Sequence, residues 1–177
     1  MKHKDSFHLE CCNDDREEKY LTFWVDGQLL GIPVTDVIQI IGMQKIVEIP
    51  EHSSYVKGLI CLRGEIVPVI DVRLRLGRIN ATYQERTCII ITKFEEGSFG
   101  FIVDGVDEVR DISEEYITPL SRIRSSWDST YLTGVARLTT GQSNHVKIIL
   151  IVDMARLAGE EGIRISTHAV KGELQNV

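Results

Sequence analysis

The sequence predicts an all-β protein built from many short strands. Segments of about 4–8 residues that alternate, or are dense in aromatic and β-branched side chains, recur along the chain. Gly, Asp-Gly or Pro turn signals separate these segments every few residues. Such a pattern is typical of small barrels or of a sandwich, and it does not distinguish one barrel from two. With 177 residues and 43% hydrophobic content, the chain can bury one solid core or two small ones without disulfides or metal.

The expected elements begin with a hairpin. After a polar leader over residues 1–19, which is expected to be mobile, residues 20–25 (YLTFWV) predict a strand and residues 28–32 predict its return. Asp26-Gly27 between them is a type I′ turn signal, because both central positions of that turn need a positive φ. Pro33 is expected to end the second strand.

Residues 34–41 are expected to form a short helix or helical turn. Their apolar side chains fall on one flank at helical spacing; these are Val37, Ile38, Ile40 and Ile41. Residues 45–49 predict a weak strand that ends at Pro50.

The most informative stretch is GLICLRGEIVPVIDVRLRLG, residues 58–77. Arg63-Gly64 between two apolar runs predicts a hairpin turn, because Gly accepts the positive φ of a tight turn. Pro68 cannot donate to a ladder, so its strand should be an edge, or that N–H side should face outward. Arg63 then projects from the hairpin rim. There it could anchor a protein partner or join a surface ion pair of little energetic weight, and the residues alone leave both possibilities open.

The rest of the chain predicts further strands joined by turns. Expected are a helical turn over 72–76 closed by Gly77, strands over 87–92, 99–103 and 106–112, a hairpin of 131–138 with 146–152, and a short helix over 153–157. Residues 113–130, which are polar and contain Pro119 and Trp127, are expected to form a long connection. Residues 159–177 form a polar tail.

Composition excludes several classes of function. The net charge of −6 argues against a nucleic-acid-binding surface, because Asp71 and other acids dilute the basic cluster of Arg73, Arg75 and Arg78. No apolar run approaches the ~20 residues of a membrane span, and the first residues lack the apolar centre of a signal peptide. We therefore expect a cytoplasmic protein without direct membrane insertion.

The cysteines are expected to be reduced, because the chain carries no export signal. Cys11 and Cys12 are neighbours that cannot readily bond to each other, and Cys61 and Cys88 lie in apolar strand patterns that favour burial.

No residue pattern indicates catalysis, a metal or a cofactor. The histidines lie in tails or loops, and no nucleophile motif or phosphate-binding glycine loop is present. The acids Asp104, Asp107 and Glu108 are interpreted as solvated turn residues rather than acid–base groups. Metal-ligand types gather near the N-terminus, but adjacent cysteines are not a zinc-site spacing; the residues concerned are His3, His8, Cys11 and Cys12.

Several blocks, taken in order, resemble the coupling proteins of bacterial chemotaxis, the CheW family. They are Val37 to Ile41, Ile49-Pro50, Lys57 to Arg73 (KGLICLRGEIVPVIDVR), Phe99 to Val106, Tyr131 to Leu138, and Ile148 to Asp153. Any one block would mean little. Together they cover nearly everything between about residues 20 and 157, and the resemblance places a CheW-like domain at 20–158.

The resemblance implies a fold and a function. The expected fold is two five-stranded SH3-like barrels side by side with short helical segments and a shared apolar seam, the middle barrel being an excursion from the outer one. The expected function is that of a non-enzymatic adaptor between the cytoplasmic tips of chemoreceptors and the regulatory domain of a CheA-type histidine kinase. It would be cytoplasmic and recruited to membrane receptor arrays.

The resemblance also implies site residues. Carried over to this sequence, receptor binding falls on Arg63, Gln39, Val37 and Ile40, with the segment around Val37 lining a groove between the barrels. Kinase binding falls on Gly58 and Gly134, whose purely structural interpretation is a turn or bulge.

The chain departs from the family pattern at two places, since Gln39 stands where the family has an acid and Cys61 where it has asparagine. These departures leave open an alternative, a CheW-like scaffold for a histidine-kinase pathway outside chemotaxis. An oligonucleotide-binding barrel would need a basic, aromatic-studded strand face, which Phe23, Trp24, Phe99 and Phe101 do not form.

Overall fold

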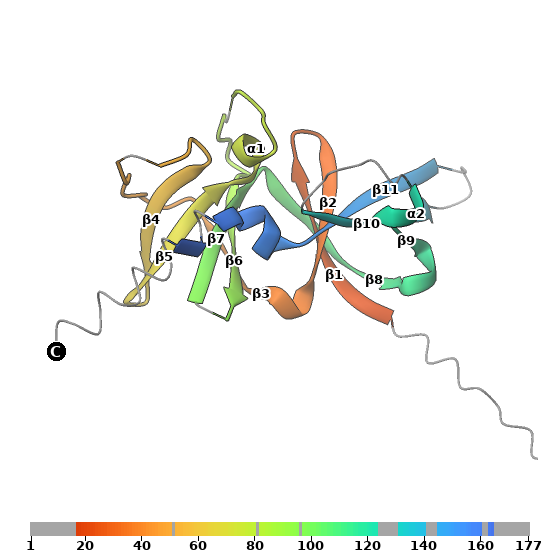
Figure 1. Ribbon diagram of the computed structural model, residues 1–177. Helices are drawn as coiled ribbons and strands as arrows, with labels where there is room; N and C mark the ends of the chain where they lie inside the picture. The colour runs from red at the N-terminus through yellow and green to blue at the C-terminus, as the bar shows by residue number, and fades with distance from the viewer. Residues whose placement is uncertain are drawn as a thin grey trace, which may run out of the picture.

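Two β-sheets lie side by side (Figure 1). The computed structural model describes residues 17–50, 52–80, 82–95, 97–123, 131–140, 145–160 and 163–164. The all-β prediction is confirmed, and so is the arrangement in two units.

The larger sheet has six strands, among them the first and the last strand of the described chain. Their order across the sheet is β8 (Gly105–Ser113), β1 (Glu17–Val25), β2 (Gln28–Pro33), β11 (His145–Val152), β10 (Leu132–Thr140) and β9 (Ile117–Pro119). Neighbours pair antiparallel except β2 and β11, which are parallel.

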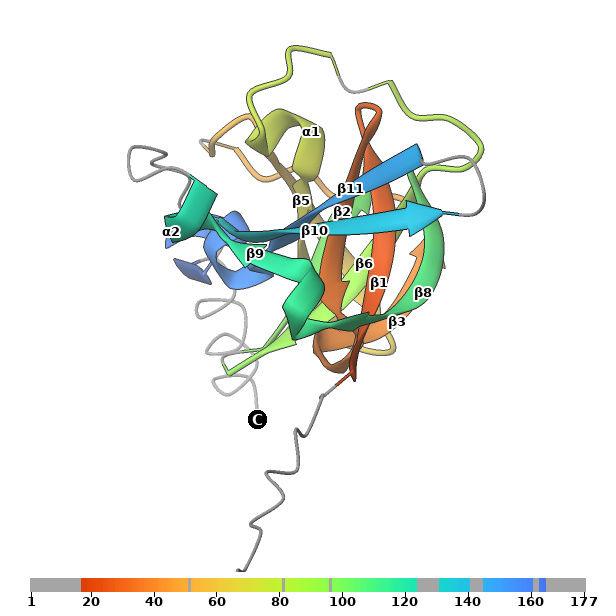
Figure 2. The same cartoon turned by 90° about the vertical axis from the view of Figure 1, so that its right-hand side faces the viewer.

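The smaller sheet has five strands and is inserted between β2 and β8, as expected of an excursion from the outer unit. Their order is β3 (Val37–Gly42), β6 (Cys88–Phe94), β7 (Gly97–Val103), β5 (Glu65–Asp71) and β4 (Val56–Leu62). The pairs are antiparallel except β5 with β7. Figure 2, turned by 90°, shows the strands of the larger sheet wrapping in front of the smaller one.

Each sheet buries both faces, because successive side chains of a strand point to opposite sides. In β6, Ile89 and Ile91 face a core that belongs to the smaller sheet, whereas Ile90 faces a core shared by both sheets. In β1, Phe23 enters the shared core and Tyr20 enters a core of the larger sheet. The expected shared apolar seam is therefore present, and it explains the continuous isoleucine run of β6.

The predicted turns follow from local chemistry. Asp26 and Gly27 both have positive φ, at 50° and 74°, as a type I′ turn requires. The helix α1 (Val72–Arg75) starts where the Asp71 carboxylate accepts a hydrogen bond from the Leu74 N–H, and Gly77 follows it at φ 78°.

The prediction of a helix over residues 34–41 is wrong beyond its first turn. Residues Val34–Asp36 form the 3₁₀ helix η1, and β3 follows. The β-branched residues of this segment pair with β6, from Val37 opposite Thr92 to Gly42 opposite Cys88. The weak strand expected over 45–49 is reduced to an isolated bridge between Val47 and Leu59.

The connection expected over 113–130 is also partly structured. It contains η2 (Glu114–Tyr116), β9 and the helix α2 (Leu120–Ile123), and β9 is the strand that makes the larger sheet six-stranded rather than five-stranded. Trp127 lies outside the described residues. At the N-terminus, β1 begins at Glu17, within the segment assigned to the polar leader.

Pro68 lies in an inner strand, since β5 is flanked by β4 and β7. The ladder to β7 covers only Val69 to Asp71, so Pro68 stands just before it and no hydrogen bond of that ladder is lost. Residues 154–160 form a helix after β11, close to the prediction.

The two described cysteines are free, and Cys61 corrects the expectation of burial. It is exposed because it lies on the edge strand β4, opposite Ile66, which is itself 42% exposed.

Candidate functional site

The β4–β5 turn presents Arg63 at the rim of the smaller sheet, as predicted. Arg63 has a φ of 53° and Gly64 a φ of 88°, so both central residues adopt the left-handed conformation of a two-residue hairpin. Both residues are exposed. A β-carbon at Gly64 would have no neighbouring atom within 4 Å, so the turn is sterically open.

Arg63 lies beside Gln39 in a hollow of about 180 Å³. All five strands of the smaller sheet or their turns contribute to its lining, as at the mouth of a barrel: Ile38, Gln39, Leu62, Arg63, Glu65, Val67, Ile91 and Ser98. Half of the lining residues are aliphatic, and the polar ones are Arg63, Gln39, Glu65 and Ser98. A half-aliphatic lining that includes a guanidinium suits a protein side chain rather than a reaction.

Val37 and Ile40, predicted with them, do not line this hollow. Val37 is half-buried and packs against the core shared by the two sheets. Ile40 is 43% exposed and Ile38 is 50% exposed, because β3 is an edge strand with a bulge between Val37 and Gln39. The structure thus brings two of the four predicted receptor residues together and leaves Ile40 exposed on the same strand.

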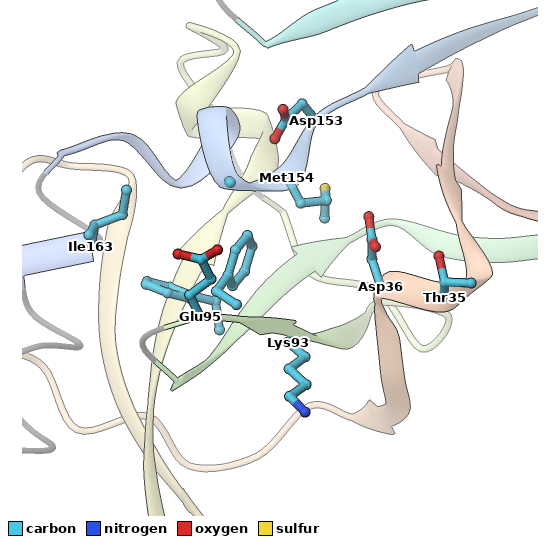
Figure 3. Close-up of a pocket in the computed structure, with 10 residues that line it drawn as sticks. Thr35, Asp36, Lys93, Glu95, Asp153, Met154 and Ile163 are labelled. Carbon is cyan, nitrogen blue, oxygen red and sulfur yellow. The ribbon is translucent and has the colours of Figure 1, made fainter.

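A larger groove, with a volume of about 700 Å³, lies between the β6–β7 hairpin, η1 and the segment that follows β11 (Figure 3). Its apolar wall includes Phe94, Phe99 and Met154, and the two phenylalanine rings meet edge to face at 4.9 Å. Figure 3 shows Lys93 pointing away from Met154 and Asp153. The groove begins immediately before Val37, since Thr35 and Asp36 also line it.

Sequence reasoning missed most of this groove. Its residues come from η1, from the β6–β7 hairpin and from the segment after β11. Only the topology joins them, so no local pattern signals it. Burial, together with the charge of Asp153, raises the pKa of Asp36 above its usual value, although a hydrogen bond with Thr35 opposes the shift.

Gly58 is buried at the base of the β4–β5 hairpin, at a β-bulge between Val56 and Gly58. Its φ is 136°, and a β-carbon there would lie 2.0 Å from the Val47 carbonyl oxygen. The reason is the bridge, in which the Val47 N–H donates to the Leu59 carbonyl at 2.8 Å and the Leu59 N–H donates back at 2.9 Å. The glycine therefore permits one backbone to cross another.

Gly134 is also buried and lies at a second bulge, in β10 opposite Pro119 of β9. A β-carbon at Gly134 would lie 2.9 Å from the Ile117 Cγ2 methyl and 3.2 Å from the Thr118 carbonyl oxygen. The interpretation of both glycines as bulge residues is confirmed. Their part in kinase binding remains a prediction. In that prediction, the kinase contacts the strands whose bulges these glycines permit.

The acids interpreted as solvated turn residues are instead partnered. Asp104 accepts two hydrogen bonds from Arg73 at 2.5 Å, and Glu108 pairs with Arg110. Asp107 pairs with Lys147 at 3.1 Å and accepts from Trp24 Nε1 and Thr22 Oγ1. Burial alone would raise the pKa of Asp107, but the Lys147 contact and these hydrogen bonds outweigh it and lower that pKa.

The basic cluster is likewise occupied within the chain. Arg73 binds Asp104, Arg78 lies 2.9 Å from the Asp26 carboxylate, and Arg75 donates to the Leu157 carbonyl at 2.8 Å. Three guanidiniums held in this way do not form a phosphate-tracking surface.

Across the described residues, no group of three or more His, Cys, Asp or Glu side chains could hold a metal ion. The N-terminal cluster considered above lies outside those residues. In the same part of the chain, no helix has the length and hydropathy needed to cross a membrane.

Curated proteins that are similar to this chain include two that are named chemotaxis protein CheW. The chemotaxis protein CheW of Klebsiella aerogenes is 29% identical over 154 residues, which cover 87% of this chain and 89% of that protein. The chemotaxis protein CheW of Bacillus subtilis is 37% identical over 100 residues, covering 56% of this chain and 64% of that protein. Both names refer to chemotaxis, so neither favours the pathway outside chemotaxis.

A solved structure has the same fold. The crystal structure of the scaffolding protein TtCheW from Thermoanaerobacter tengcongensis matches with a TM-score of 0.70 and 30% identity, over 82% of this chain and 95% of that one. The model of the CheW-like domain matches residues 19–162. The chain belongs to the CheW-like domain family.

Proposed function

We propose that this protein is a non-enzymatic adaptor that couples chemoreceptors, the methyl-accepting chemotaxis proteins, to a CheA-type histidine kinase. The observation that carries the proposal is the hollow that Arg63 and Gln39 both line, at the rim of the smaller sheet of a CheW-like domain. In this proposal the protein works in the cytoplasm and is recruited to receptor arrays at the membrane. No cofactor, metal or nucleic acid takes part.

The receptor contact is assigned to the hollow and to the exposed side of β3. Arg63 supplies a planar fork of hydrogen-bond donors, while Leu62 and Val67 supply apolar area beneath it. Ile40 is exposed on the same edge strand, but it lies opposite Ile90 and so on the other face of the sheet from Gln39. This combination of an arginine with buried aliphatic surface is typical of energetic hot spots in protein interfaces.

The kinase contact is assigned to the edges that the two glycines shape. Gly58 lies in β4, an edge strand of the smaller sheet, at the opposite end of the hairpin from Arg63. Gly134 holds β9 against β10 at one edge of the larger sheet. Edge strands offer backbone groups for pairing with another chain, and the regulatory domain of the kinase is the partner that the family resemblance implies.

An adaptor must engage both partners at once. Because the hollow and the edge at Gly58 lie at opposite ends of one hairpin, the two partners would not exclude each other. The receptor state can then bias the kinase through a difference in binding free energy, typically about 1–3 kcal/mol for coupled sites.

The test is a titration of the full-length protein with the regulatory domain of a CheA-type kinase, with and without saturating receptor tip. We expect the kinase domain to bind in both cases and a ternary complex to form. Competition for one site, or no binding of the kinase domain at all, would contradict the proposal. The Arg63→Glu variant serves as the control with weakened receptor binding.

A further inference from the structure

The helix α1 is fixed to the smaller sheet. It follows β5 directly, Val72 is fully buried in the shared core, and the carboxylate of the buried Asp71 caps its first turn. The same carboxylate accepts a hydrogen bond from Tyr83 at 2.7 Å, and the Asp71 N–H donates to the Tyr55 carbonyl at 2.8 Å. The helix therefore moves with the smaller sheet.

The side chain of Arg73 reaches Asp104, the residue that links β7 of the smaller sheet to β8 of the larger sheet. Its Nε and Nη2 atoms both donate to Asp104 at 2.5 Å. Asp104 is held by the β1–β2 hairpin, since its N–H donates to the Trp24 carbonyl at 2.9 Å and its carboxylate accepts from the Asp26 N–H at 2.6 Å. Arg73 is thus joined to the β1–β2 hairpin through Asp104, by a bidentate, partly buried ion pair whose two side chains are 20% and 23% exposed.

Two further arginines cross at different points. Arg78 reaches Asp26 on the β1–β2 turn, and Arg75 reaches the Leu157 carbonyl in the helix that follows β11. The Arg75 guanidinium also lies 4.9 Å from the centre of the ring of Tyr55, the residue before β4 of the smaller sheet. Figures 1 and 2 both place α1 at the same end of the molecule as the β1–β2 turn.

The three contacts supply what the seam itself lacks. Burial of apolar area in the shared core holds the sheets together, but the hydrophobic effect is non-directional. The bidentate bond between Arg73 and Asp104 has a fixed geometry. This bond and the Arg78 contact end at the β1–β2 hairpin, whereas the Arg75 contact ends at the helix that follows β11. The three contacts can therefore set the angle between the two sheets.

We propose that Arg73, Arg75 and Arg78 are positioning residues, which fix the orientation of one sheet relative to the other and so couple the receptor-binding surface to the kinase-binding surface. The orientation concerns the free protein, whereas the coupling rests on the proposed function. Arg73 carries most of the effect, because the Arg78–Asp26 pair is 48% and 41% exposed and is screened by water.

The test measures the distance between two spin labels in the free, full-length protein. One label is attached to Cys61 in the smaller sheet and the other to a cysteine placed at Val109 in the larger one, with Cys11, Cys12 and Cys88 replaced by alanine. We expect a single narrow distance distribution for the parent and a broadened or shifted one for Arg73→Gln. Arg73→Lys keeps the charge without the fork, so its distribution should lie between the two.

The control variant is Lys19→Gln, which removes the 2.6 Å ion pair between Lys19 and Asp111 within the larger sheet. Its distances should match those of the parent. If the distances in folded Arg73→Gln also match the parent, the positioning role is overturned. If that variant does not fold, Arg73→Lys decides the question by the same comparison.

A second arm measures control of the kinase by the receptor. Arg73→Gln should bind each partner alone as the parent does and yet lose control of the kinase by at least about fivefold, the low end of an allosteric coupling. If Arg73→Gln alters the label distances but the receptor still controls the kinase as in the parent, the proposed coupling is overturned. If the parent itself fails to couple receptor to kinase, the proposed function fails, and the distances still decide whether the arginines set the orientation.

Discussion

The two ends of the β4–β5 hairpin use glycine for opposite purposes. At the tip, Gly64 has a φ of 88° and open space where a β-carbon would be. At the base, Gly58 has a φ of 136° and would place a β-carbon 2.0 Å from the Val47 carbonyl oxygen. The tip tolerates other residues and can carry a contact residue such as Arg63, whereas the fold requires glycine at the base. A binding assay of a variant at the base therefore reports loss of folded protein before it reports loss of a contact.

The largest expected effect is that of Gly58→Ala on stability. The substitution combines a φ that L-residues rarely adopt with a clash against backbone, so the Val47–Leu59 bridge must open. We expect a loss of about 3 kcal/mol or more in the free energy of unfolding, measured by chemical denaturation.

The matched control for that experiment is Gly64→Ala, which meets only the strain of its φ and should cost about 1 kcal/mol. A cost at Gly58 no larger than that at Gly64 would contradict the comparison. A bulky substitution such as Gly58→Trp would therefore test the fold rather than contact with the kinase.

Arg63→Glu should have the next largest effect, on binding rather than on stability. Because the side chain is exposed at an open turn, the unfolding free energy should change by less than about 0.5 kcal/mol. Binding of the receptor tip should weaken by about 2 kcal/mol, a hot-spot loss, with kinase binding unchanged. Calorimetric titration measures both affinities. Arg122→Glu, an exposed arginine of α2 on the other sheet, is the control, and equal losses for the two variants would show that Arg63 is misassigned.

The difference between tip and base also explains what the sequence could predict. Turns follow from residues that are adjacent in the chain, so Asp26-Gly27, Arg63-Gly64 and Gly77 were predictable. The segment around Val37 was not, because the apolar spacing at 37, 38, 40 and 41 fits both a helix and a strand. Pairing with β6, about 50 residues away in the sequence, decides between them. The strand β9 exists only because β10 offers it an edge.

The candidate site divides in the same way. Arg63 was predictable as an exposed rim residue, whereas its proximity to Gln39 depends on how the two edge strands approach each other around the hollow. The larger groove is lined by Asp36, Phe99 and Met154, which are far apart in sequence. Residue type can suggest which residues contact a partner, but only the topology shows which residues share one surface.

Gly134→Ala sharpens the comparison between the two bulges. Its β-carbon would meet a side-chain methyl of Ile117 at 2.9 Å rather than a backbone atom at 2.0 Å, and its φ is not in the left-handed region. Because a methyl can move, we expect a smaller loss of about 1–2 kcal/mol in the free energy of unfolding. Chemical denaturation beside Gly58→Ala measures it, and an equal or larger loss than at Gly58 would show that backbone crossing is not what makes Gly58 special.

The smallest effect, and the one most specific to the tip, is that of Gln39→Glu. The substitution adds one negative charge to a hollow whose other charged lining residues are Arg63 and Glu65. At a partly desolvated contact, one charge changes binding free energy by about 1 kcal/mol. The sign of this change indicates the charge that the receptor presents to position 39. A receptor tip that presents a cation should bind more tightly, and one that presents an anion should bind more weakly. Titration of several receptor tips at two salt concentrations measures it, because screening should shrink either change. The exposed Gln44→Glu is the control, and unchanged affinity for every tip would show that position 39 does not face the receptor.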